Sequence, residues 1–219
     1  MDKEKYKNYF LTQYKTGFSK NRVVLYRNWF YPQWKKLMKI VKIKKDTKIL
    51  EIGAGMGALY SYLTEIGLNS YTGLELDSDA VRFCNNYFKT KSFQNLSFEE
   101  FTTTRKYDYV FAFEVLEHLS DPEQCIDKIF HQLKEKGQFV GTSPYPYIKN
   151  IRADKTHKYV LHPENWRRLF LQAGFSKVEV VPMSFLPYLW RINKKLNVPI
   201  PFYVPLNNFI STTFIIANK

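Results

Sequence analysis

The sequence predicts a doubly wound α/β domain built on a seven-stranded, mostly parallel sheet. Short apolar runs alternate with helical patterns between residues 47 and 181, as in folds whose helices cover both faces of a parallel sheet. The first run ends in a glycine-rich turn at residues 53–57, and such a strand–turn–helix lies at the carboxyl edge of the sheet. The last two runs have no ordinary crossover helix between them, and we expect the last strand to be antiparallel.

The chain has 219 residues, of which 45% are apolar, and this suits one domain with a sizeable core. Within it we expect an N-terminal helical cap (residues 1–44), an α/β core (45–182), a lid or substrate-facing insertion (183–207) and the last strand (208–219). The insertion is rich in proline, aromatic and basic residues. A surface excursion that only covers the sheet edge is the alternative reading of that segment.

The predicted strands are short apolar runs bounded by turn residues. Thr47–Ile52 is the first of them and leads into the glycine turn. Tyr107–Phe113 is the clearest buried strand, because it is apolar at almost every position. The other predicted strands are Tyr71–Leu76, Phe93–Phe98, Phe139–Thr142, Val178–Val181 and Phe209–Ile216.

The helices are predicted from apolar residues at helical spacing and from capping residues. Residues 3–41 are expected to be helical, with a break at Pro32. Asp121-Pro122 suits a helix start, because aspartate can cap the first turn and proline fits the first helical position. The other predicted ends are Asp77 or Ser78 and His162-Pro163 at N-termini, and Gly67, Gly137 and Gly174 at C-termini.

The net charge is +13, from 33 Lys and Arg against 20 Asp and Glu. A basic surface attracts nucleic acid, anionic lipid or phosphorylated molecules, and it equally serves solubility. The four histidines are scattered and both cysteines, Cys84 and Cys125, fall at apolar helix positions, so neither a metal site nor a disulfide framework is predicted. The N-terminus is too polar for a signal peptide, and no apolar run approaches the ~18–20 residues of a membrane span. We therefore expect a soluble, cytoplasmic protein.

The glycine turn that follows Thr47–Ile52 is the main candidate for a ligand site. Glycine lets the backbone approach a ligand closely, because it has no Cβ. Glu75 lies 18 residues beyond Gly57, at the end of the second predicted strand. A carboxylate at that place can accept both hydrogen bonds from a ribose diol.

The turn alone leaves two cofactor classes open. Gly53-x-Gly55-x-x-Ala58 also fits the dinucleotide fingerprint, so a nicotinamide- or flavin-dependent enzyme is an alternative. Glu51 precedes the first glycine by two residues. An acid there suits a cationic ligand, such as the amino group and sulfonium of S-adenosylmethionine, better than a pyrophosphate.

With these residues the sequence resembles the class I S-adenosylmethionine-dependent methyltransferases, and within them the branch of ubiquinone-biosynthesis O-methyltransferases and other small-molecule methyltransferases. The resemblance covers roughly residues 45–182 and implies the Rossmann-like methyltransferase fold. The matching motifs, in the family's order, are Glu51-x-Gly53-x-Gly55-x-Gly57, Gly73–Asp77, Tyr107–Val110, Glu114–Leu119, Leu133–Phe139 and Gln172–Phe175.

The resemblance implies S-adenosylmethionine as cofactor and assigns roles to individual residues. A hydroxyl acceptor benefits from a nearby base, and the resemblance favours His118, with His157 as the second candidate. Capping or packing is the alternative role for either histidine. The implied cofactor-binding residues are Glu51, Gly53, Ala54, Gly55 and Gly57 at the methionine end, Glu75 with Leu76 beside it at the ribose, Ser97 and Phe98 at the adenine, and Phe113 and Glu114 near the methyl group.

The acceptor is expected to be a hydroxyl of a small molecule, a sugar or a lipid-linked intermediate. The end of the fourth strand reads Phe113-Glu114-Val115 and lacks the Asn/Asp-Pro-Pro-aromatic tetrad of many amino methyltransferases. An RNA methyltransferase is therefore a less favoured alternative, as is a nicotinamide-dependent oxidoreductase. The tract Phe185–Leu196 is aromatic and then basic, which suits peripheral membrane contact, although a packed lid helix is equally open. The sequence does not give the oligomeric state.

Overall fold

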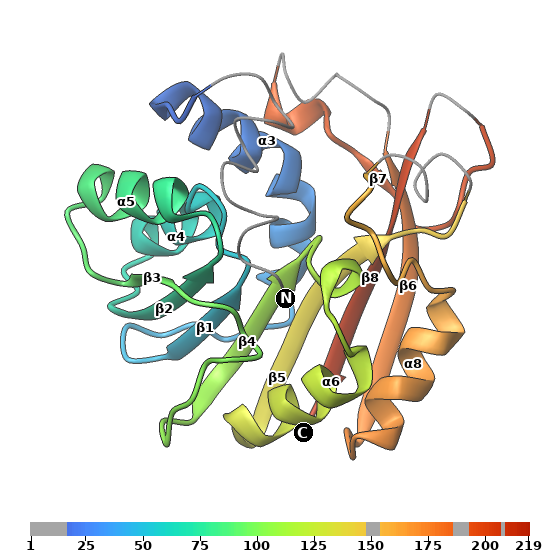
Figure 1. The fold of residues 1–219 in the computed structure, drawn as a ribbon. Coiled ribbons are helices and arrows are strands. Elements are labelled where there is room, and N and C mark those ends of the chain that lie inside the picture. Colours follow the sequence, from blue (N-terminus) through green and yellow to red (C-terminus); the bar gives the residue numbers. More distant parts are fainter. Residues whose placement is uncertain (1–16, 148–153, 186–192, 207–208) are drawn as a thin grey trace.

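An eight-stranded sheet in the order β3-β2-β1-β4-β5-β8-β6-β7 organises the molecule (Figure 1). The computed structural model describes residues 17–147, 154–185, 193–206 and 209–219. The strands are β1 (Lys48–Ile52), β2 (Ser70–Glu75), β3 (Phe93–Asn95), β4 (Tyr107–Phe113), β5 (Leu133–Pro144), β6 (Lys177–Phe185), β7 (Pro199–Ile200) and β8 (Ile210–Asn218).

Strands β1 to β5 are parallel, and β8 is antiparallel to both of its neighbours, β5 and β6. The strand order reverses between β1 and β4, and open α/β sheets bind ligands at the carboxyl ends of strands at such a point. The predicted fold class is confirmed. The seven predicted strands are present, and the eighth, β7, lies inside the segment 183–207 and pairs with the end of β6.

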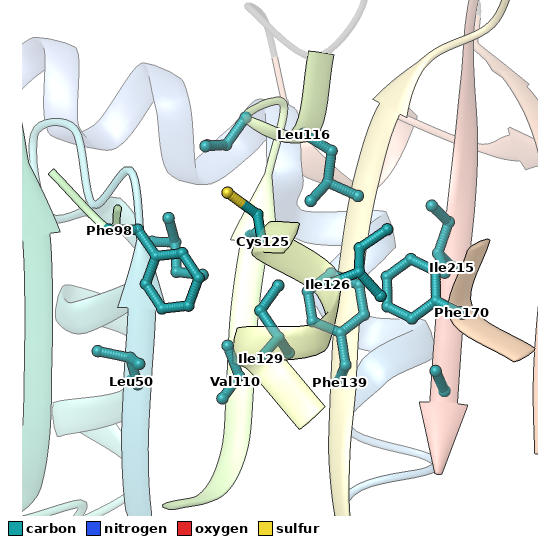
Figure 2. Close-up of a cluster of buried hydrophobic side chains, with 14 of the residues drawn as sticks. Leu50, Phe98, Val110, Leu116, Cys125, Ile126, Ile129, Phe139, Phe170 and Ile215 are labelled. Carbon is teal, nitrogen blue, oxygen red and sulfur yellow. The ribbon is translucent and has the colours of Figure 1, made fainter. Parts of the chain in front are cut away.

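Helices cover both faces of this sheet, α6 and α8 on one face and α3, α4 and α5 on the other (Figure 1). Alternate residues of each central strand point to opposite faces, so Leu50 and Val110 join one core while Ile49 and Phe111 join the other. Figure 2 shows the first core, in which Phe139 of β5 contacts Phe170 of α8. The helices are α3 (Lys20–Leu37), α4 (Ala58–Glu65), α5 (Ser78–Tyr87), α6 (Pro122–Gln132) and α8 (Pro163–Gln172), with 3-10 turns η1 (Leu116–His118) and η2 (Lys194–Leu196).

The predicted break at Pro32 is wrong, because α3 runs through this residue without interruption. Proline has no N–H, so the helix loses the hydrogen bond that residue 32 would donate to the carbonyl of Asn28. The buried side-chain amide of Asn197 donates instead to the carbonyls of Asn28, at 3.3 Å, and Trp29, at 2.8 Å. A residue distant in the sequence thus satisfies the carbonyl that the proline leaves without a partner.

The predicted stop at Gly137 is also wrong, since α6 ends at Gln132 and β5 begins at Leu133. Leu133 is buried and pairs with Tyr107, and the register then shifts before Gln138 pairs with Tyr109. Gly137 lies within this irregular stretch, where an added Cβ would come within 2.8 Å of the carbonyl oxygen of Lys134. Its role is in the bulged strand and not in a helix cap.

Several predicted caps are confirmed. The carboxylate of Asp77 accepts from the backbone N–H groups of Asp79 and Ala80 at the start of α5. Asp121 accepts from the N–H of Gln124 at the start of α6. Within the described residues, no helix is long and apolar enough to cross a membrane.

Candidate active site

A cleft of about 470 Å³ opens at the carboxyl ends of β1, β2 and β4, where the strand order reverses. Its floor is the turn after β1, one end is formed by the ends of β2 and β3, and the opposite end by the segment after β4. Helix α3 supplies a wall. Of the thirteen predicted site residues, all but Gly57 line this cleft.

The glycine turn follows β1 with its backbone in the left-handed region at Gly53 and Gly57, both with φ of 70°. A side chain at Gly53 would collide with Val115, which follows β4. A Cβ at Gly57 would lie 2.6 Å from the ring of Phe88 and 2.9 Å from that of Phe93. Gly57 is therefore required for packing and as the N-cap of α4, and it does not face the cleft.

Glu75 is fixed at the end of β2 by backbone hydrogen bonds. One carboxylate oxygen accepts from the N–H of Gly55 at 2.8 Å, and the other accepts from Leu76 at 2.7 Å and Asp77 at 2.9 Å. Burial raises the pKa of Glu75, whereas these three N–H groups oppose the rise. The carboxylate therefore keeps one orientation at the floor of the cleft.

Glu51 lies in β1 and is buried with its carboxylate bonded to the hydroxyl of Tyr71, which donates. Burial raises the pKa of Glu51 to about 8, the hydrogen bond from Tyr71 acts against this rise, and the charge of Glu75 adds to it. A cation that enters the cleft would favour the charged form of this carboxyl and so promote loss of its proton.

The end of the cleft beside β3 is formed by Leu76, Leu96, Ser97 and Phe98. The hydroxyl of Ser97 accepts from the backbone N–H of Glu100 at 3.1 Å, so part of its capacity serves a local turn. Phe98 reaches into the core that Figure 2 shows and is 1% exposed. This end of the cleft is therefore mainly apolar, and the hydroxyl of Ser97 is the polar side-chain group among these four residues.

Glu114 directly follows β4 and has a left-handed backbone, with φ of 54°. Such a conformation is uncommon for a residue with a side chain and is typical of functional sites. It is held by β5 and β8, because its N–H donates to the carbonyl of Thr142 at 3.0 Å and its carboxylate accepts from the hydroxyl of Thr212 at 2.7 Å. Burial raises the pKa of Glu114, while Thr212, Thr142 and the nearby His157 lower it.

His118 and His157, which are far apart in the sequence, lie with their ring centroids 5.0 Å apart. The fold thus brings together two histidines that are scattered in the sequence. The carbonyl of Glu117 accepts from the N–H groups of Lys158 and Tyr159, at 2.8 and 3.0 Å, and so ties the loop that carries His157 to η1. One ligand atom each of Glu117, His118 and His157 falls within 4.8 Å of the others, which makes these three a candidate metal-ligating group.

Glu117 is 1% exposed, and its carboxylate oxygens have no described partner that meets full hydrogen-bond geometry, although the hydroxyl of Ser143 and the backbone N–H of Glu117 lie near enough to lower its pKa. Burial raises the pKa of Glu117 well above its usual value, and the charge of Glu114 raises it further. Its Oε1 lies 3.8 Å from Nε2 of His118. Sequence reasoning did not single out Glu117, although the motif Glu114–Leu119 contains it.

An aromatic wall lines the cleft beside Glu114. Phe113 packs against Phe30 and Trp34 of α3, with ring centroids 5.7 and 6.4 Å apart. Tyr26 and Trp29 of the same helix continue this wall. No sequence signal shows that these aromatic residues of α3 face the cleft.

The ionisable side chains that line the cleft are mostly acidic, in contrast to those of the whole chain. Among the described residues that line it there are five carboxylates and two histidines, with no lysine or arginine. The protein as a whole carries a net charge of +13. A cationic ligand is favoured in such a cleft, and a pyrophosphate or nucleic-acid backbone is disfavoured. The carboxylates are Glu51, Glu75, Glu114, Glu117 and Asp154.

A family model described as a methyltransferase domain matches residues 26–180, which include most of α3, strands β1 to β5 and the start of β6. The chain belongs to this methyltransferase family. Among curated relatives of this methyltransferase is a ubiquinone biosynthesis O-methyltransferase of Glaesserella parasuis serovar 5 (strain SH0165), 28% identical over 178 residues that cover 68% of this chain and 75% of the relative.

Solved structures show the same fold as this methyltransferase. A methyltransferase of Thermotoga maritima, described as a possible histamine N-methyltransferase, has a TM-score of 0.70 at 13% identity and covers 97% of each chain. A methyltransferase of Archaeoglobus fulgidus has a TM-score of 0.69 at 22% identity over 96% of this chain and 99% of that one. The chain is thus an enzyme that uses S-adenosylmethionine, as the sequence predicted.

Proposed function

We propose that this methyltransferase transfers a methyl group from S-adenosylmethionine to a hydroxyl of a small, largely apolar or lipid-linked acceptor. The observation that carries the proposal is the composition of the cleft. Carboxylates and histidines meet an aromatic wall there, and no described lining residue is basic. The name of the ubiquinone biosynthesis O-methyltransferase relative supports a hydroxyl acceptor.

The residues at the floor of the cleft fit the cofactor. Glu75 would accept from the ribose hydroxyls, and its orientation is already fixed by three backbone N–H groups. The turn around Gly53 would bring the backbone against the methionine portion, with Glu51 beneath it as a counter-charge. Leu76, Ser97 and Phe98 would flank the adenine.

The bound cofactor supplies an electrophilic methyl group on a positively charged sulfur, so the protein has to align the acceptor and manage its proton. Phe113 and the α3 aromatics would hold the body of the acceptor. Its hydroxyl would then face Glu114, His118 and His157, which line the same end of the cleft. We propose that this group promotes removal of the hydroxyl proton, with Glu114 as one acceptor for it.

The alternatives fit the cleft less well. A nicotinamide dinucleotide would place a pyrophosphate among buried carboxylates, which is electrostatically unfavourable. An RNA acceptor would need basic side chains at the cleft to neutralise phosphates, and the described lining residues provide none.

Turnover on defined acceptors tests the proposal. The protein is mixed with S-adenosylmethionine and a panel of phenols, sugars and hydroxylated lipids, and S-adenosylhomocysteine is measured together with the mass of the product. We expect a mass gain of one methyl on a hydroxyl of an apolar acceptor. Glu114→Gln, which keeps an acceptor for Thr212 but loses the charge, should lower kcat roughly 10²–10⁴-fold. Methylation of amines or RNA alone would disprove the acceptor class.

A route for a lipid-linked acceptor is also part of the proposal. Val198, Phe202 and Leu206 are each about 60% exposed, and they lie in the segment whose Asn197 is bonded to α3 beside Trp29 of the cleft wall. Exposed apolar side chains on a basic protein favour contact with an anionic membrane. We expect co-sedimentation with phosphatidylglycerol vesicles that Phe202→Ser weakens, and equal sedimentation of both proteins would contradict this route. Residues 186–192 of the tract Phe185–Leu196 lie outside the described residues.

A further inference from the structure

The carboxylate of Glu117 is incompletely satisfied by the described residues. It is buried at the end of the cleft, the nearby hydroxyl of Ser143 lowers its pKa, and yet neither oxygen has a partner that meets full hydrogen-bond geometry. A buried carboxylate without a donor or a cation is costly. Glu114 and Asp154 are the other acids near it, and the side chains of opposite kind beside it are His118 and His157. A cation bound at this place would remove the penalty.

His118 presents a specific nitrogen to Glu117. The hydroxyl of Thr156 donates to Asp154, at 2.6 Å, and its oxygen therefore accepts from Nδ1–H of His118, at 3.0 Å. A histidine whose Nδ1–H is held in this way presents Nε2 as the ligand atom, which is the arrangement found around metal-bound histidines. Nε2 is also the nitrogen that lies 3.8 Å from Oε1 of Glu117.

The spacing of the donor atoms suits a shared ion. Metal–ligand distances of about 2.0–2.2 Å place two ligands of one ion ~3–4 Å apart. The separation of 3.8 Å is too long for a hydrogen bond and falls within that range. His157 brings a third donor, and all three ligand atoms lie within 4.8 Å of one another.

We propose that Glu117, His118 and His157 bind a divalent transition-metal ion at the acceptor end of the cleft. Two imidazoles and one carboxylate form a ligand set typical of Zn²⁺, Mn²⁺ and Fe²⁺ sites that keep open positions. Because the ligands line the cleft, an open position would face the acceptor.

The role of the ion in catalysis rests on the proposed O-methylation, whereas its binding does not. A hydroxyl placed at an open position would lose its proton more readily. That proton would pass to Glu114 or to water, the acceptor oxygen would bond to the methyl carbon, and the bond from that carbon to sulfur would break with release of S-adenosylhomocysteine. The histidines would then act on the hydroxyl through the ion.

Metal binding is tested directly on the tag-free full chain. Protein stripped with EDTA is titrated with MnCl₂ and with ZnCl₂ by calorimetry, and the signal of free Mn²⁺ is followed by electron paramagnetic resonance. We expect saturable binding near one ion per chain. Glu117→Gln and His157→Asn should each weaken binding at least about tenfold. His157 is partly exposed on a loop, so its replacement tests the site even if Glu117→Gln does not fold.

His131→Asn is the matched control, because this exposed histidine on α6 pairs with Asp127 outside the cleft. It should bind metal as the unaltered protein does. No saturable binding by the unaltered protein, or equal binding by His157→Asn, would overturn the proposal.

The metal site and the proposed O-methylation can be tested separately. The same proteins are titrated with S-adenosylmethionine and assayed with the acceptor panel. Metal binding lost only in the cluster variants supports the site even if no hydroxyl is methylated, and hydroxyl methylation unchanged by EDTA removes the ion's catalytic role.

Discussion

At the ribose end of the cleft, Glu75 is held by three backbone N–H groups that all come from residues 55–77. At the acceptor end, Glu114 is held by Thr212, and Glu117 is joined to a loop about 40 residues further along the chain. The first end is built from one continuous strand–turn–helix–strand unit, and its Glu75 has hydrogen-bond donors for both oxygens. The second is assembled from distant segments, and the buried carboxylate of Glu117 there has no described partner of full hydrogen-bond geometry. The end that we propose for the cofactor is thus preorganised, whereas the end that we propose for the acceptor is suited to take up a cation or a substrate.

Replacement of Glu75 should have the largest effect, because it should weaken cofactor binding without changing metal binding at the other end of the cleft. Glu75→Ala removes the acceptor for the ribose hydroxyls and the anchor of three N–H groups, so the Kd for S-adenosylmethionine should rise about 100-fold, or ~3 kcal/mol. Calorimetry measures this change. Metal affinity in the same variant should remain near that of the unaltered protein, and a parallel loss of both would show that the two ends are not independent.

A smaller effect is expected on the pH dependence of cofactor binding. The pKa of Glu51 is raised to about 8, mainly by burial, so the carboxyl is mostly protonated below this pH and charged above it. A cationic ligand prefers the charged form. Affinity for S-adenosylmethionine should therefore increase as the pH rises from 6 towards 8, by up to about tenfold per pH unit, and level off above the folded-state pKa.

The variants Glu51→Gln and Tyr71→Phe sharpen this test. Glu51→Gln has no proton to release, so its affinity should lose most of the pH dependence. Tyr71→Phe removes the hydrogen bond that lowers the pKa of Glu51, so the level region should begin at a higher pH. An unchanged slope in Glu51→Gln would assign the pH dependence to another group.

The smallest expected effect concerns the wall of the acceptor end. Asn197→Ala removes donors from the carbonyls of Asn28 and Trp29 and should lower the free energy of unfolding by ~1–2 kcal/mol, measured by urea denaturation. Asn86→Ala on the exposed side of α5 is the control and should change stability by less than about 0.5 kcal/mol.

A double-mutant cycle identifies the cause. Pro32→Ala restores the N–H that bonds to the carbonyl of Asn28, so Asn197→Ala should cost less in this background. Equal costs in both backgrounds would show that Asn197 stabilises the protein by other contacts.

The difference between the two ends also explains what the sequence could predict. The turn from Glu51 to Gly55 and the acid at Glu75 follow neighbouring strands closely spaced in the sequence, so the strand pattern and the family resemblance together predicted one site. Strand Tyr107–Phe113 was predicted with its final bounds because its burial on both faces leaves a continuous apolar run.

Other features depend on partners that spacing does not reveal. The meeting of His118 with His157 depends on a loop tied to the carbonyl of Glu117. Helix α3 passes through Pro32 because Asn197 satisfies its carbonyls. Leu133 begins a strand because Tyr107 offers it a pairing partner, and no local pattern distinguishes this from one more helical turn. Each of these outcomes is a tertiary contact that overrides a local preference.

The placement of β8 between β5 and β6 has a consequence for synthesis on the ribosome. Until residues 210–218 emerge, the nascent chain exposes an unpaired edge along β5, and β6 has no neighbour through which to join the sheet. Exposed strand edges favour aggregation, so chaperones that shield them should matter most until β8 has emerged. Thr212 arrives with the same strand, and the carboxylate of Glu114 gains its anchor only then. Maturation of the catalytic end is thereby coupled to completion of the sheet.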